Sequence, residues 1–128
     1  SISKKNTLFP KKNYWEIMTK TSIANGLMES VLERRMETNR PDNEKSLNFI
    51  KKQEIRIART IEWLENNWKN YNRNYLTMDQ VAIACALDYT IFRFNNKWKK
   101  NCPKLTKWFE DFINNEFMQA TSPREKIK

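Results

Sequence analysis

The chain has 128 residues and a formal net charge of +9, and it contains one glycine and no histidine. Without histidine it lacks the commonest general base and the commonest metal ligand, so His-dependent catalytic triads are excluded and no metal site is expected. With Gly26 as its only glycine, the chain cannot build glycine-rich phosphate loops or a set of tight hairpins, so the composition predicts an all-α fold.

The apolar residues do not form a membrane segment. No stretch reaches the roughly 18 uninterrupted apolar residues of a membrane-spanning helix, and the basic residues 1–12 lack the apolar core of a signal peptide. The two cysteines, Cys85 and Cys102, fit neither a zinc motif nor a disulfide framework, and Cys85 is expected to be a buried, unreactive thiol. We therefore expect a soluble, cytoplasmic protein with no membrane partner.

Two long amphipathic helices are expected in the first half of the chain. Pro10 and Pro41 each stand where a first helical position would be, which predicts helices over about 11–38 and 42–70. In both ranges apolar residues recur at intervals of three and four, the spacing of one helical face. The short connection predicts that the two helices pack antiparallel.

The next expected helix is the least polar part of the chain and follows an asparagine-rich loop over 66–76. Thr77 and Gln80 have the spacing of a capping box, in which each side chain bonds the main-chain N–H of the other residue, and Leu76 and Val81 have the spacing of a hydrophobic staple. Because the residues that follow leave no polar face, we expect the helix to be surrounded by others. We interpret the box and the staple as structural features.

The positive charge has two interpretations. Clustered Lys and Arg would indicate a nucleic-acid partner, but the cations are scattered along this sequence and only residues 96–104 are locally dense. We therefore favour an ordinary solvated surface and expect no nucleic-acid partner. Arg93, between two phenylalanines, could clamp an anion, pair with a carboxylate or stack on a ring.

Motifs along nearly the whole chain resemble the C-terminal, all-helical domain of a bacterial subgroup of cytosolic glutathione transferases. They are LFP at 8–10, IANGLMESVLERRME at 23–37, LTMDQV at 76–81, CALDYTIFRF at 85–94, P.L..WF at 103–109 and F...T.P at 117–123. Family members usually have Asp where this chain has Gln80, but glutamine can still close the capping box.

The resemblance implies a fold and a domain organisation. The fold is a glutathione-transferase C-terminal-like bundle of five to six helices over residues 11–123, with residues 1–10 as the remnant of an interdomain linker and residues 124–128 as a tail. In these transferases a thioredoxin-like N-terminal domain holds the co-substrate glutathione, and no part of this chain resembles that domain. We therefore expect that the chain alone is inactive and does not bind glutathione.

The resemblance also implies a function. The 128 residues are either a piece of a two-domain transferase or a chain that acts without performing the glutathione reaction. The helical domain of the family walls the pocket for a small hydrophobic electrophile and forms part of a homodimer interface. The alternative is a non-catalytic interaction module of the translation-factor or aminoacyl-tRNA-synthetase type, near RNA.

The resemblance places the pocket on the first helix and near the end of the chain, and no catalytic residue is assigned. The candidate lining residues are Tyr14, Trp15, Met18, Ser22, Phe117 and Met118. Aromatic and Met side chains suit a promiscuous apolar pocket. Each of them is equally compatible with packing in a core or an interface.

Overall fold

The computed structural model describes residues 14–67 and 76–114. Within these two ranges the chain forms four α-helices, one 3-10 helix and no strand, namely α2 (Tyr14–Thr38), α3 (Leu47–Asn66), α4 (Met78–Arg93), η2 (Lys97–Lys100) and α5 (Pro103–Ile113). The all-α prediction is confirmed, although the described α-helices are fewer than the five to six expected. The expected linker remnant, residues 1–10, and the expected tail, residues 124–128, lie outside the described residues.

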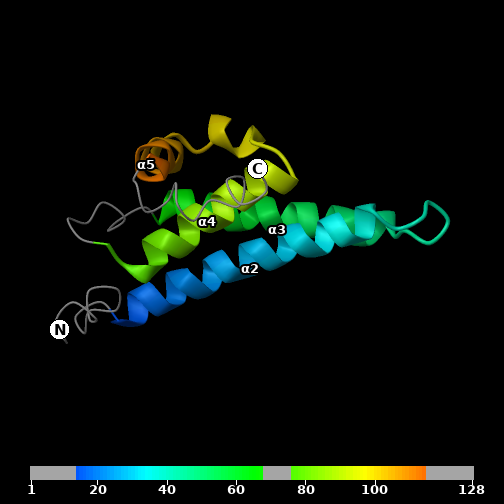
Figure 1. The fold of residues 1–128 in the computed structure, drawn as a ribbon, viewed down its shortest axis with the longest axis horizontal. Helices are drawn as coiled ribbons and strands as arrows, with labels where there is room; N and C mark the ends of the chain where they lie inside the picture. The colour runs from blue at the N-terminus through cyan, green and yellow to red at the C-terminus, as the bar shows by residue number, and fades with distance from the viewer. Residues whose placement is uncertain (1–13, 68–75, 115–128) are drawn as a thin grey trace.

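The helix α2 packs against both α3 and α4, and α5 contacts α3 and α4. Figure 1 shows that α2 and α3 run antiparallel, as predicted, with α5 and η2 on the side of α4 away from α2. Buried side chains from all these elements meet in one core, which includes Leu27, Val31, Ile57, Ile61, Leu64, Ile83, Leu87, Trp98, Leu105 and Phe109. The apolar helix α4 is therefore enclosed, as its sequence predicts.

The second long helix begins five residues later than predicted, at Leu47 instead of Asp42. The carbonyl of Pro41 accepts from the N–H of Glu44 at 2.9 Å, so the chain makes a turn here before the helix begins. This start was wrong because Pro41 takes the first position of that turn, and a helix-compatible proline does not by itself begin a helix. Leu47 is consequently 74% exposed and does not belong to the core stripe.

Ser46 is the residue that starts this helix. Its hydroxyl accepts from the N–H of Phe49 at 3.1 Å, and its own N–H donates to Oε2 of Glu37 at 2.7 Å. The bond from Ser46 lowers the pKa of Glu37, and the neighbouring Arg40 and Lys45 lower it further. A carboxylate at the end of α2 thus holds the cap of α3, which closes the turn between the two helices.

The same helix ends at Asn66 rather than near Asn70. At Asn67 the main-chain N–H still bonds the carbonyl of Trp63, at 3.0 Å, and the side-chain Nδ2 donates to the same oxygen at 2.9 Å. Asparagine side chains compete in this way for main-chain groups, which favours a helix end. The expected helix end at Asn70 was therefore wrong, and Trp68, Tyr71 and Tyr75 lie outside the described residues.

The capping box at the start of α4 is present, with Thr77 as the N-cap. The N–H of Thr77 donates to Oε1 of Gln80 at 3.0 Å. The other bond of the box runs from the N–H of Gln80 to the Thr77 hydroxyl. It is shared, because this N–H also donates to Oδ1 of Asp79 at 3.0 Å, and the Thr77 hydroxyl itself donates to that oxygen. All three side chains are buried, so this helix end satisfies its polar groups internally.

We expect Thr77→Ala to lower the free energy of unfolding by about 1 kcal/mol or more, because it removes the capping hydroxyl from a buried helix end. Denaturant titration followed by circular dichroism measures this loss. The matched control is Thr77→Ser, which keeps the hydroxyl and should lose less. Equal midpoints for wild type and Thr77→Ala would contradict the role of the cap.

The start of α5 is capped by a residue from another helix. Oε1 of Glu65 accepts from the N–H of Leu105 at 2.8 Å, and Oε2 accepts from the N–H of Lys104 at 3.3 Å. A carboxylate at a helix N-terminus bonds free N–H groups and interacts favourably with the helix dipole. Glu65 therefore joins the end of α3 to the beginning of α5.

We expect Glu65→Gln to destabilise the protein by about 1 kcal/mol, because a neutral amide is a poorer acceptor at this helix end. Glu62→Gln is the matched control, since Glu62 is exposed one turn earlier on the same helix and makes no hydrogen bond or ion pair in the described part of the chain. Its effect should stay within about 0.5 kcal/mol. Thermal unfolding of both variants checks the prediction, and equal losses would contradict it.

Candidate functional site

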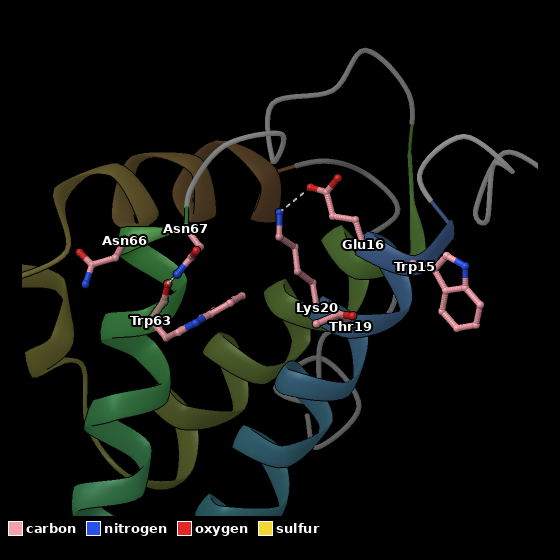
Figure 2. A pocket seen from close by; sticks show the side chains of 7 residues that line it. All are labelled: Trp15, Glu16, Thr19, Lys20, Trp63, Asn66 and Asn67. Atoms are coloured by element: carbon pink, nitrogen blue, oxygen red, sulfur yellow. Dashed lines mark hydrogen bonds and ion pairs between the residues drawn. The ribbon is translucent and has the colours of Figure 1, made fainter.

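An open groove lies between the beginning of α2 and the end of α3 (Figure 2), with a volume of about 560 Å³. Because the two helices run antiparallel, residues far apart in the sequence meet here. The groove is lined by Trp15, Glu16, Thr19 and Lys20 from α2 and by Trp63, Asn66 and Asn67 from α3. Five of these seven residues are polar or charged, so the groove is more polar than most small-molecule sites, and its apolar contacts come from the two tryptophans.

The charged groups of the groove form a pair. Nζ of Lys20 donates to Oε1 of Glu16 at 2.8 Å, and Lys20 is only 6% exposed. Glutamate four residues before lysine is the favourable order on a helix, because each charge then also interacts well with the helix dipole. The wall of the groove on α2 is therefore polar but locally charge-balanced.

The two tryptophans are placed differently. Trp63 is 38% exposed, and Figure 2 shows its ring extending from α3 into the space towards α2. Trp15 is 78% exposed and points away from the centre of the groove. Its ring packs edge-on against Tyr14, with ring centroids 5.3 Å apart. Trp63 is thus the aromatic side chain best placed to contact a bound group.

The structure brings together only some of the residues that the resemblance places at the pocket. Trp15 lines the groove, whereas Tyr14 does not line it but packs against the Trp15 ring. Met18 is half-buried and Ser22 is exposed, and neither lines this groove. Tyr14, Met18 and Ser22 follow one another at intervals of four residues, so they share a neighbouring face of α2. The remaining two candidates, Phe117 and Met118, lie outside the described residues.

Sequence reasoning missed the contribution of α3 to the groove. Trp63 stands off the three-and-four rhythm that predicts the buried face of this helix, and a tryptophan on the polar side was a usable signal. Asn66 and Asn67 fell where the predicted second helix and the predicted asparagine-rich loop overlap, and neither prediction pointed to a site. Lys20 carried no signal at all, because its burial depends on the packing of α2 against its neighbours.

The arginines near the end of α4 make structural contacts. The guanidinium of Arg93 lies 4.2 Å from the centre of the Phe92 ring, so of its three possible roles the structure supports stacking. Arg34 lies over the Phe94 ring, also at 4.2 Å, and its Nε donates to Oε2 of Glu54 at 2.7 Å. Arg34 therefore ties α2 to α3 and to the end of α4.

The two thiols are arranged differently from the expectation. Cys85 is partly exposed, whereas Cys102 is buried. Burial raises the pKa of the Cys102 thiol, and the carboxylates of Glu65 and Glu62 raise it further. A thiol at a helix N-terminus usually has a lowered pKa, but at the start of α5 these two effects prevail, so Cys102 is not an activated nucleophile.

Two features are absent from the described ranges. In residues 14–67 and 76–114, no group of three or more Cys, Asp or Glu side chains is placed to hold a metal ion. The helices in those ranges also include none with the length and apolar content needed to cross a membrane.

The fold is similar to solved glutathione transferase structures. One is a glutathione transferase family member from Pseudomonas fluorescens Pf-5, with TM-score 0.82 and 24% sequence identity in a complex with S-(propanoic acid)-glutathione. The same protein with glutathione gives a TM-score of 0.83 at 24% identity. A glutathione S-transferase from Methylobacillus flagellatus KT with glutathione bound gives 0.83 at 19% identity. The chain has the fold of a glutathione-transferase C-terminal-like helical domain.

This fold assignment covers most of the chain but only part of the similar proteins. Each comparison covers 91% of this chain, while the chain spans 58–62% of the length of the chains it matches. No family model matches the sequence, and no curated protein matches it significantly. The likeness to glutathione transferases is therefore one of fold.

Proposed function

We propose that this chain is the helical half of a glutathione-transferase-like protein and forms one wall of a pocket for a small hydrophobic electrophile. The observation that carries the proposal is the match over 91% of the chain to structures of transferases with glutathione bound. In the whole protein, glutathione is the co-substrate for conjugation or reduction and is held by a thioredoxin-like domain outside these 128 residues. The groove beside Trp63 and Trp15 is the part of the pocket wall that this half supplies.

The exposed face of α2 is the surface that we assign to the missing domain and to a second subunit. Leu32 and Met36 are exposed near the end of this helix, and Tyr14 is exposed near its beginning. Between them lies Gly26, where an added Cβ would meet nothing within 4 Å. A mid-helix glycine in open space lowers the stability of the helix relative to alanine. Its lack of a side chain allows the backbone of a partner to pack close to the helix.

The chain by itself should bind glutathione weakly or not at all, because the groups that hold the tripeptide belong to the thioredoxin-like half. Titration calorimetry of the 128-residue chain with glutathione should therefore give no measurable heat of binding. Micromolar affinity would contradict this division of roles.

The groove alone should still bind a small aromatic compound weakly. The probe is 4-nitrobenzyl alcohol, an unreactive relative of nitrobenzyl electrophiles, and binding is followed by the broadening of its NMR signals. We expect Trp63→Ala to weaken binding about fivefold, because the ring is the main apolar contact in the groove. Leu47→Ala is the matched control, since Leu47 is exposed at the opposite end of the same helix. Equal broadening for wild type and both variants would place the electrophile elsewhere.

A further inference from the structure

The outward side of α3 carries a row of cations. Lys52, Arg56 and Arg59 are all exposed and follow one another at intervals of four and three residues, so their side chains lie on one face of the helix. The helical rise places the three within about 10 Å along the axis. Trp63 continues the row at the next interval of four residues.

The fold makes no use of these three charges. No ion pair or hydrogen bond involves the side chains of Lys52, Arg56 or Arg59 within residues 14–67 and 76–114. Like charges at intervals of three and four destabilise a helix, so the row opposes the formation of α3. These cations therefore contribute nothing to stability that would explain their alignment.

The glutamates of the same helix are mostly directed towards the bundle. Glu54 pairs with Arg34 of α2, and Glu65 caps α5. The third, Glu62, is exposed three residues beyond Arg59 and forms no ion pair within the described ranges. The formal charges of α3 nearly cancel in the sequence, but the packing leaves the outward face basic.

Trp63 provides an aromatic surface at the end of this row. Its ring is partly exposed and makes no ring contact with any described residue, although its carbonyl accepts from Asn67. Tryptophan exposes both a π-face and an apolar edge, and adjacent cations add to its attraction for flat, negatively charged ligands. Cations followed by a free aromatic ring have the composition of single-strand-binding surfaces.

We propose that Lys52, Arg56, Arg59 and Trp63 bind single-stranded nucleic acid, with phosphates on the cations and a base stacked on the indole ring. A membrane surface fits less well, because the buried stripe of α3 lies in the core and its exposed apolar residues, Leu47, Ile55 and Trp63, are spread along the helix instead of forming one apolar face. An acidic protein would pair with the cations but would offer no flat ring to stack on Trp63. The site shares Trp63 with the proposed groove, but its three cations do not line that groove, so its salt dependence is tested separately from the transferase-like function.

The sequence favoured the opposite expectation for a physical reason. In linear order the cations of residues 52–59 alternate with apolar and polar residues, and no cluster is visible. Helical periodicity brings three of them onto one face, and only the packing of α3 decides that this face is turned to solvent.

The test uses the complete 128-residue chain and a fluorescein-labelled oligouridylate of about 12 nucleotides. Binding is followed by fluorescence anisotropy. Three phosphate contacts to a single strand give a slope of about −2 in log affinity against log salt, so raising the salt from about 50 to about 200 mM should weaken binding about twentyfold. Affinity that does not change with salt would overturn the proposal.

Removing the row should abolish this salt dependence. The triple variant Lys52→Gln, Arg56→Gln, Arg59→Gln is expected to show a slope near zero. Its matched control is Lys97→Gln, Lys100→Gln, Lys107→Gln, which removes the same charge from exposed positions on η2 and α5 and should keep the slope. If the two triple variants lost affinity and salt dependence equally, net charge alone would account for the binding, and the proposed site would be wrong.

The role of the ring is tested separately. Trp63→Ala should weaken binding about tenfold, as expected for the loss of one stacked base, and Trp63→Phe should retain most of the affinity. Trp15→Ala is the control, because this exposed ring is not part of the row. The proposal would be overturned if Trp63→Ala had no effect on affinity or if a duplex bound as tightly as the single strand. It would also be overturned if polyglutamate of equal charge displaced the oligonucleotide, or if anionic lipid vesicles bound more tightly than it does.

Discussion

The packing of α2 between α3 and α4 is the constraint on which the other features depend. One side of α2 buries Leu27 and Val31 in the common core, so the direction of α3 is set by the short turn and by this shared stripe. The antiparallel arrangement then places the end of α3 beside the beginning of α2. The groove exists because these two helix ends meet there, and Trp63 reaches it only in this register.

The helix ends are held by side chains that lie elsewhere in the fold. Glu37, at the end of α2, bonds the N–H of the cap of α3, and Glu65, near the end of α3, bonds the first N–H groups of α5. At α4 the capping residues belong to the helix itself, and the Asp79 carboxylate takes part. Because unpaired N–H groups at helix ends are costly, Glu37 and Glu65 each couple the start of one helix to the position of another.

The two sides of α3 suggest two separate uses of one helix. Its end contributes to a groove in a fold shared with glutathione transferases, while its outward face carries cations that pair with no carboxylate in the described part of the chain. The two surfaces meet at Trp63. A small aromatic compound and a nucleobase both offer a flat ring to this indole, but only a nucleic acid also brings phosphates to Arg56 and Arg59. The cations therefore distinguish the two ligands.

Local signals in the sequence correctly predicted the class of the fold and one helix start. The capping box at Thr77 was recognisable because a cap needs only residues within one turn, and the antiparallel pairing of the first helices followed from the short connection between two amphipathic helices. The start predicted at Pro41 was wrong because Pro41 begins a turn, and Ser46 is the residue that caps the helix. Half of the aromatic lining was also missed, since Trp63 lies outside the rhythm.

The sequence by itself therefore determined an all-helical chain, the start of α4 and the resemblance to a transferase helical domain. Only the tertiary structure decided which side chains meet in the groove, that Cys102 rather than Cys85 is buried, and that Lys52, Arg56 and Arg59 face solvent together. The reason is physical. Capping and periodicity act within a few residues of the chain, whereas burial and the pairing of charges depend on which helices come into contact.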